Sequence, residues 1–292
     1  MLKNNHPRIF DCQTEYEQAD IVVFGAPFDS TTSYRPGARF GPKEIRSQSF
    51  GFEDYSPYQD ACISDFSIYD GGDIELPMGD TRKTLDMVSQ AVDEILNQDK
   101  FPLMLGGEHL LTLPALESVH KKYEDICLIQ FDAHADLRDS YLEVRLSHAC
   151  VIRRAWDLLG KGKIFQFGIR SGDKLEFDFA SDETNGIYTE KFTVDSLEQV
   201  KEIIKDRPVY FTIDLDVLDP SVLPGTGTPE AGGISYLKLQ EAMVYVIENF
   251  NVRALDMCEL SPPNDISGIS TAAACKLLRE ALIAFGKKVP QS

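Results

Sequence analysis

An apolar run leads directly into three potential metal-binding side chains in the stretch Ile126-Cys127-Leu128-Ile129-Gln130-Phe131-Asp132-Ala133-His134-Ala135-Asp136. Its first six residues are typical of a short strand that is buried on both faces of a sheet. Similar runs occur at residues 21–24, 66–69, 102–105, 163–167, 186–188, 209–213 and 252–257. Helical apolar spacing occurs between many of them, at residues 81–96, 112–123, 148–159, 196–204, 236–247 and 270–285. We therefore predict an α/β fold in which a mainly parallel, eight-stranded sheet carries helices on both faces.

The composition is that of an ordinary globular protein. The chain has 292 residues, of which 43% are hydrophobic, and no linker or repeat divides it, so we expect a single domain over residues 1–292. Its 29 Lys and Arg residues against 47 Asp and Glu residues give a net charge of −18, which disfavours a nucleic-acid or anionic-membrane partner. No apolar stretch is long enough to span a bilayer. The six cysteines contain no C-x-x-C pair, so we expect reduced, mostly buried thiols in a cytoplasmic protein.

Four of the predicted strands end in acidic or histidine side chains. In chain order these are His109, Asp132, His134, Asp136, Asp214, Asp216 and Glu259. Parallel α/β sheets place their sites beyond the carboxyl ends of the strands. Because neighbouring strands lie about 4.8 Å apart, these side chains can meet only if the four strands are near neighbours at the middle of the sheet.

The chemistry of these side chains favours a metal centre. Alternation along an extended segment would point Asp132, His134 and Asp136 to one side. Many carboxylates with few imidazoles form an oxygen-rich set that suits Mn²⁺. Four aspartates balance the charge of two divalent ions. An added hydroxide would give the site a net negative charge, which favours a cationic substrate. Helix capping would explain His109 or His148 taken singly, but it does not explain the whole set.

The chain resembles the ureohydrolase family, the dinuclear manganese enzymes that include arginases, agmatinases and guanidinobutyrases. The motifs that carry the resemblance are Tyr34-Arg35-Pro36-Gly37-Ala38-Arg39-Phe40-Gly41-Pro42, Gly106-Gly107-Glu108-His109, the segment at 131–136 and the segment at 214–233. The resemblance implies an arginase-like, three-layer α/β/α fold, two Mn²⁺ ions per subunit and a homo-trimer or homo-hexamer.

The resemblance also implies roles for individual residues. It implies that one ion is held by His109, Asp132, Asp136 and Asp214, and the other by Asp132, His134, Asp214 and Asp216. Catalytic and substrate-binding roles are implied for Asp136 as a proton relay, His148 as a proton shuttle and Glu259 as the partner of the guanidinium. Glu108 stands where many relatives have Asp, which we expect to adjust the surroundings of His109 without loss of the metal.

The expected reaction is hydrolysis of agmatine to urea and putrescine, a step of polyamine biosynthesis. The segment Thr228-Pro229-Glu230 resembles agmatinases and guanidinobutyrases more than arginases. Arg138 and Arg145 argue mildly for a substrate carboxylate instead, although a solvent-facing or ion-paired role is an alternative for both. Three alternative functions stay open. They are a guanidinobutyrase, a catalytically idle regulator that binds metal or polyamine, and a deacetylase-type metal hydrolase.

Overall fold

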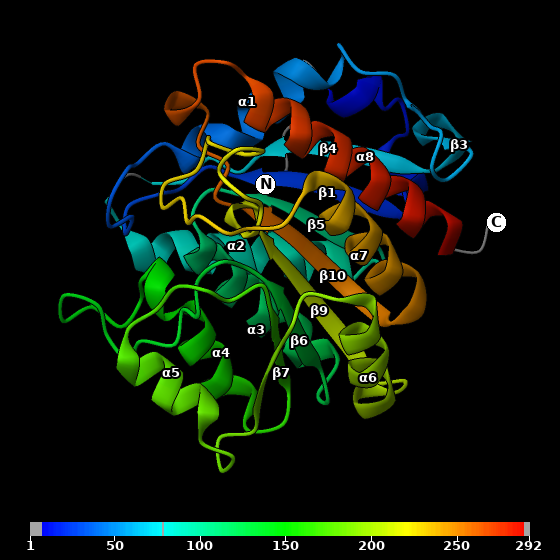
Figure 1. The fold of residues 1–292 in the computed structure, drawn as a ribbon. Coiled ribbons are helices and arrows are strands. Elements are labelled where there is room, and N and C mark those ends of the chain that lie inside the picture. The colour runs from blue at the N-terminus through cyan, green and yellow to red at the C-terminus, as the bar shows by residue number, and fades with distance from the viewer. Residues whose placement is uncertain (1–7, 78, 289–292) are drawn as a thin grey trace.

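The computed structural model describes residues 8–77 and 79–288 and is built around one eight-stranded parallel sheet (Figure 1). In spatial order the strands are β4 (Ile68–Asp73), β1 (Ile21–Ala26), β5 (Phe101–Gly106), β10 (Asn251–Cys258), β9 (Pro208–Asp214), β6 (Cys127–Phe131), β7 (Ile164–Phe167) and β8 (Ile187–Glu190). Every neighbouring pair is parallel. All eight predicted strands are therefore confirmed, with ends that shift by a few residues.

Helices cover both faces of the sheet, which gives three layers (Figure 1). One face packs against α1 (Gly41–Ser49), α6 (Val194–Ile204), α7 (Tyr236–Asn249) and α8 (Ile269–Lys288). The other packs against α2 (Thr81–Leu96), α3 (Thr112–Lys122), α4 (Val151–Leu159) and α5 (Lys174–Ser181). Alternate residues of a strand enter the two cores, as Val22 and Val23 do. This explains why the strands read as continuous apolar runs.

Two helices lie outside the stretches that show helical spacing in the sequence. Helix α1 begins at Gly41 with Pro42 in its first turn, a position where proline needs no hydrogen-bond partner. Helix α5 begins with a capping box, in which Asp173 and Glu176 each accept a backbone hydrogen bond from the other. The spacing Asp-x-x-Glu was a usable signal for α5. The predicted helix at 148–159 instead opens with a 3-10 turn, η6 (His148–Cys150), before α4.

The four strands that end in polar side chains are adjacent at the centre of the sheet, in the order β5-β10-β9-β6. This confirms the arrangement that the chemistry of their ends predicted. In β9 and β10 the last residues, Asp214 and Cys258, are directly paired. The carboxyl ends of these strands therefore converge on one region at the sheet edge.

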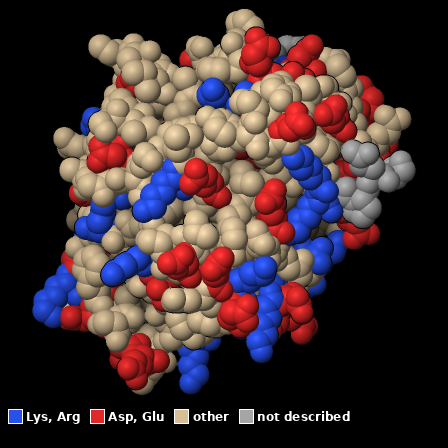
Figure 2. Space-filling model, turned by 45° about the vertical axis from the view of Figure 1, so that its right-hand side comes forward, with Lys and Arg blue, Asp and Glu red and all other residues tan. Residues whose placement is uncertain are grey.

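The surface carries both signs of charge. Figure 2 shows acidic and basic side chains interspersed over the face that it presents. In the described part of the chain, no helix is both long enough and apolar enough to cross a membrane.

Candidate metal centre and active site

The six side chains predicted as metal ligands meet at the carboxyl edge of the central strands. They are His109, Asp132, His134, Asp136, Asp214 and Asp216. The Nδ1 atom of His109 lies 3.0 Å from Asp132, 3.1 Å from Asp136 and 3.5 Å from Asp214. The Nδ1 atom of His134 lies 2.9 Å from Asp216 and 3.7 Å from Asp132. Asp132 therefore presents Oδ2 to one histidine and Oδ1 to the other.

The carboxylates accept hydrogen bonds from backbone N–H groups of the loops after β6 and β9 and from one side chain within β6. Asp132 accepts from the side-chain amide of Gln130 at 2.7 Å and from the backbone N–H of His134 at 2.6 Å. Asp214 accepts from the Asp216 N–H at 2.8 Å, and Asp216 accepts from the Ala133 N–H at 3.1 Å. The two loops are thereby tied to each other as well as to their own strands.

Asp136 departs from the extended segment that alternation predicted, because its φ is +52°. This backbone turn lets the carbonyl of Asp136 accept hydrogen bonds from Ile152 and Arg153, both at 3.1 Å. Those donors belong to the first turn of α4, where N–H groups lack partners within the helix. The side chain of Asp136 still reaches His109. The left-handed turn therefore satisfies α4 while leaving the carboxylate in the cluster.

The electrostatics of the cluster fit a cation. Burial and the charges of Asp216 and Asp132 raise the pKa of Asp214 well above its usual range. Burial and the charge of Asp132 raise the pKa of Asp136 to about 7. The Nδ1 atom of His109 is buried and faces the oxygens of Asp132, Asp136 and Asp214, but among the described residues it makes no hydrogen bond. Divalent ions would offset the repulsion between the carboxylates and accept the lone pair of that nitrogen, so these residues fit a metal centre.

A buried polar network behind His109 was missed by sequence reasoning. Asp256, within β10, accepts from the hydroxyls of Tyr210 at 2.6 Å, Thr212 at 2.7 Å and Thr112 at 2.9 Å. The Thr212 hydroxyl lies 2.9 Å from Nε2 of His109. Since Thr212 gives its only hydrogen to Asp256, it accepts from Nε2, which assigns the tautomer that leaves Nδ1 free to bind metal. An acidic residue inside an apolar strand was the available signal.

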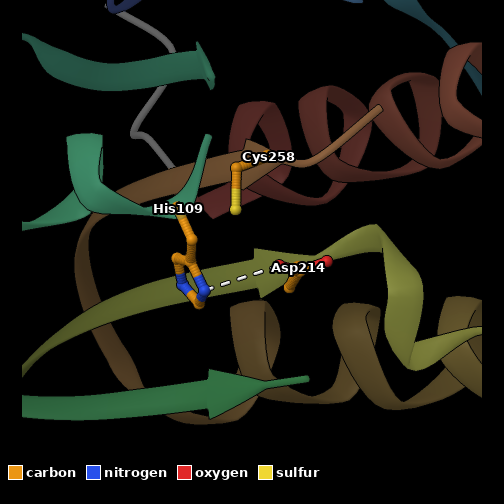
Figure 3. Close-up of side chains that lie close together, drawn as sticks. All are labelled: His109, Asp214 and Cys258. Atoms are coloured by element: carbon orange, nitrogen blue, oxygen red, sulfur yellow. Dashed lines mark ion pairs between the residues drawn. The ribbon is translucent and has the colours of Figure 1, made fainter. Parts of the chain in front are cut away.

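Cys258 is a seventh polar group at this site. Its sulfur lies with His109 and Asp214 in a group whose ligand atoms are within 4.8 Å of one another, and it points toward them in Figure 3. Burial and the charge of Asp214 raise the pKa of Cys258 well above its usual range, and the thiol donates to the carbonyl of Ile213 at 3.6 Å. A neutral thiol is a poor ligand for a hard cation, so we interpret Cys258 as a side chain that packs against the cluster without binding the metal. All six cysteines are free, and only Cys62 is not buried.

A cavity of about 190 Å³ opens in front of the cluster. Its lining includes His134, Asp136 and Asp214 of the cluster, together with Ser33, Arg138, Tyr141, His148, Ala149, Ser171, Gly172, Glu176 and Thr228. The cavity admits only a small molecule. A substrate in it would contact the predicted metal ligands and His148 together.

His148 lies where a proton shuttle is useful. It lines the cavity, and its Nε2 atom is buried without a hydrogen-bond partner among the described residues. Burial and the nearby His134 and His109 lower the pKa of His148 to about 4. A neutral imidazole with a free ring nitrogen can accept or pass on a proton without binding the metal.

Glu259 is buried against the cluster and does not belong to the lining of this cavity. Its Oε1 atom accepts from the backbone N–H of His109 at 2.8 Å. Its φ of +64° marks a sharp turn directly after β10. Burial and the charge of Glu108 raise the pKa of Glu259 to about 8. One carboxylate oxygen is thus engaged by the backbone, and the contact with a substrate guanidinium stays a prediction.

Arg138, which lines the cavity, and Arg145, which is not part of its lining, are both paired with carboxylates. Arg138 lies 3.2 Å from Glu176 and 3.4 Å from Asp173. Arg145 is 61% exposed and lies 3.2 Å from Asp157 and 3.4 Å from Asp139. The ion-paired alternative therefore describes both residues.

Comparisons with known proteins agree with this geometry. The family model described as the arginase family matches residues 19–284. An agmatinase of Bacillus subtilis (strain 168) is 46% identical over 277 residues, which cover 94% of each protein. An N(1)-aminopropylagmatine ureohydrolase of Thermococcus kodakarensis is 40% identical and covers 94% of this chain and 93% of its own. The solved agmatine ureohydrolase of Thermoplasma volcanium has a TM-score of 0.88 at 33% identity, covering 97% of this chain and 96% of its own. With its three-layer fold and its cluster of histidines and carboxylates, the chain belongs to the arginase family.

Proposed function

We propose that this protein is an agmatinase that hydrolyses agmatine to urea and putrescine and requires two Mn²⁺ ions. The observation that carries the proposal is the cluster in which Asp132 faces both His109 and His134. Two histidines that share one carboxylate provide for two adjacent metal sites. The similarity to agmatinases over most of the chain supports this substrate.

The ligand set is proposed to divide into two sites with shared carboxylates. One ion would be held by His109, Asp132, Asp136 and Asp214, and the other by Asp132, His134, Asp214 and Asp216. When bound, the two ions would supply a water molecule of lowered pKa and neutralise charge that develops during the reaction. The oxygen-rich donor set and the neutral state of the Cys258 thiol support manganese over softer metals.

The chain's own residues would orient the substrate and carry its protons. Water adds its oxygen to the guanidinium carbon, the bond from that carbon to the alkyl-bearing nitrogen breaks, and putrescine leaves as the amine. Asp136 would accept the proton that the attacking water loses, and His148 would carry a proton toward the leaving nitrogen. Glu259 would hold the guanidinium through charge-assisted hydrogen bonds. The position of Asp136 and His148 on one cavity supports this division of roles.

The charges around the cavity support a cationic substrate tail. Because Arg138 and Arg145 are both paired with acidic residues, neither offers an unpaired cation to a substrate carboxylate. A carboxylate buried without a partner is strongly disfavoured. The cavity lining includes the carboxyl groups of Asp136, Asp214 and Glu176, which attract the ammonium group of agmatine and repel the carboxylate of 4-guanidinobutyrate. This argument disfavours the guanidinobutyrase alternative.

The deciding experiment compares kcat/KM for four guanidino compounds with Mn²⁺ present. The compounds are agmatine, N(1)-aminopropylagmatine, 4-guanidinobutyrate and arginine. We expect agmatine to exceed 4-guanidinobutyrate by about 100-fold or more, because a buried unpaired charge costs several kcal/mol. Arg145→Gln serves as a control and should leave this ratio unchanged. A preference for 4-guanidinobutyrate would reassign the protein as a guanidinobutyrase, and no urea from any compound would favour a regulator.

A further inference from the structure

Glu108 is a buried carboxylate that none of the proposed catalytic steps uses. Both of its oxygens are engaged by one residue, since the N–H of Thr31 donates to Oε2 at 2.7 Å and the Thr31 hydroxyl donates to Oε1 at 2.5 Å. The N–H of Glu108 in turn donates to the carbonyl of Phe28 at 2.7 Å. The loops that follow β1 and β5 are therefore joined by several hydrogen bonds beside the metal centre.

The Thr31 hydroxyl has a second partner, the backbone N–H of His148, which donates to it at 2.9 Å. A hydroxyl has one hydrogen and two lone pairs, so Thr31 can donate to Glu108 and accept from His148 at the same time. The carboxylate sets the direction of the hydroxyl. With its hydrogen given to Glu108, Thr31 presents a lone pair to the amide of His148.

The amide of His148 depends on this contact because of its place in η6. It is the first residue of that turn, where backbone N–H groups have no partner within the helix. The preceding Ser147 makes no side-chain cap. The ring of His148 is not held at Nε2, since that atom has no hydrogen-bond partner in the described ranges. The backbone anchor at Thr31 thus contributes directly to where the imidazole lies.

We propose that Glu108 and Thr31 are positioning residues that hold His148 at the cavity through the relay Glu108–Thr31–His148. The proposal rests on the proposed function, in which His148 carries protons. Neither residue lines the cavity, so both act through His148. Glu108 is adjacent to the proposed ligand His109 in the chain. The relay therefore couples the position of His109 to that of the proposed proton carrier, His148.

The test replaces the hydroxyl without changing the size of the side chain. Thr31→Val removes both hydrogen bonds of the hydroxyl. Thr31→Ser retains the hydroxyl and should therefore retain the position of His148. Thr32→Val is the matched control, because the neighbouring Thr32 hydroxyl is buried without a hydrogen-bond partner in the described part of the chain. Glu108→Gln keeps the shape of the side chain but offers one acceptor fewer, so it should resemble Thr31→Val in weaker form.

Two readouts are needed, on the manganese-loaded enzyme. Hydrogen exchange measured by mass spectrometry on the segment 146–152 should show about tenfold faster exchange of the His148 amide in Thr31→Val. With agmatine, kcat should fall about tenfold while KM and manganese content stay within about twofold of the wild type, because proton carriers contribute about 10² to 10⁴ in rate. Thr31→Ser and Thr32→Val should match the wild type in both readouts.

The outcomes separate this proposal from the proposed function. Unchanged exchange at His148 in Thr31→Val would overturn the relay whatever the activity. An equal loss of kcat in Thr32→Val, or loss of manganese in Thr31→Val, would also overturn it, because the effect would then be general or act on the ligands. A wild-type enzyme that releases no urea would overturn the proposed function, while the exchange data would still decide whether Thr31 anchors His148.

Discussion

At the scale of single residues, Asp132 connects the two halves of the cluster. Its two oxygens face different histidines, and the side chain is fully buried. A carboxylate in this position can serve two cations at once, which is the role proposed for it. The loss of one oxygen would therefore weaken both metal sites together.

The change Asp132→Asn should lower metal content and activity in parallel. The amide offers one oxygen, so we expect less than about half of the wild-type manganese and at least about a 100-fold loss of kcat, because changes to outer-shell partners alone cost about 10- to 100-fold. Metal analysis after gel filtration and a urea assay are the measurements. Asp125→Asn, at an exposed ion pair with Lys163, is the control and should change neither. Full turnover by a variant with confirmed near-zero metal would contradict the metal mechanism.

The network behind His109 predicts a different effect for Asp256→Asn. An amide at this position can no longer accept all three hydroxyl hydrogens, so the Thr212 hydroxyl loses its fixed direction toward His109. We expect manganese affinity to fall about 10- to 100-fold, as it does when partners of metal-bound histidines are changed. Manganese titration monitored by activity and by calorimetry measures this. Tyr210→Phe, which removes one donor and leaves the Thr212 contact, should have a smaller effect, and an equal effect would refute the assignment.

His148→Ala should separate proton transfer from metal binding. His148 lines the cavity but belongs to none of the three groups of described side chains that could hold a metal ion. We therefore expect wild-type manganese content and a kcat lower by about 10² to 10⁴. Stopped assays with agmatine and metal analysis on the same preparation are the measurements. His120→Ala, on α3, controls for loss of any imidazole, and a loss of metal in His148→Ala would mean that its role is misassigned.

At the scale of elements, the site depends on how closely the loops after β1 and β5 approach each other. Gly107 lies at this junction, and a Cβ atom added there would come within 1.8 Å of the carbonyl oxygen of Phe28. No residue that carries a Cβ atom has room at this position unless the backbone moves. The approach of these two loops is what brings Thr31 to Glu108.

Gly107→Ala should therefore destabilise the protein and disturb the site. Overpacking of this kind costs about 1 to 3 kcal/mol or more, which lowers the melting temperature by about 2 to 4 °C for each kcal/mol in a protein of this size. Thermal unfolding of the metal-loaded enzyme is the measurement. Gly51→Ala is the matched control, because its added Cβ would meet only the Gln48 carbonyl, at 3.3 Å. Equal melting temperatures for the two variants would show that the junction can relax.

At the scale of the whole molecule, the net charge of −18 sets a negative field around the protein. Acidic and basic groups are interspersed on the face in Figure 2, so much of this charge belongs to a solvated surface. The net negative charge should still attract a dication over a distance of about the Debye length, roughly 10 Å at 0.1 M salt. The homo-trimer or homo-hexamer that the family resemblance implies stays a prediction.

Long-range attraction should act on the capture of substrate and not on its conversion. We therefore expect kcat/KM for agmatine to fall as ionic strength rises, while kcat stays constant. Initial rates in a sodium chloride series at fixed Mn²⁺ measure both. For 4-guanidinobutyrate, a zwitterion of no net charge, the fall should be smaller. Equal slopes for both substrates would indicate that the net charge plays no part in capture.

The sequence alone determined the sheet and the composition of the cluster. Residues buried on both faces of a parallel sheet must be apolar, so eight strands were visible as apolar runs, and the residues at their carboxyl ends identified the candidate ligands. Adjacency of β5, β10, β9 and β6 followed because His109, Asp132 and Asp214 cannot meet otherwise. Helices α1 and α5 were not predicted, because their first turns are marked by Pro42 and by the Asp173–Glu176 capping box more than by apolar spacing.

Only the tertiary structure decided what surrounds those ligands. The relay from Glu108 through Thr31 joins residues 77 apart in the chain, and the Asp256 network joins β9, β10 and α3. Such contacts leave no periodic trace in the sequence, because each depends on one hydrogen bond between loops or strands that meet only after folding. The pairing of Arg138 and Arg145 with nearby acids was likewise open in the sequence. Spacing along a chain predicts which side chains reach the edge of a sheet. The direction of each hydrogen bond and the pairing of each charge depend on distances between side chains that only the folded structure sets.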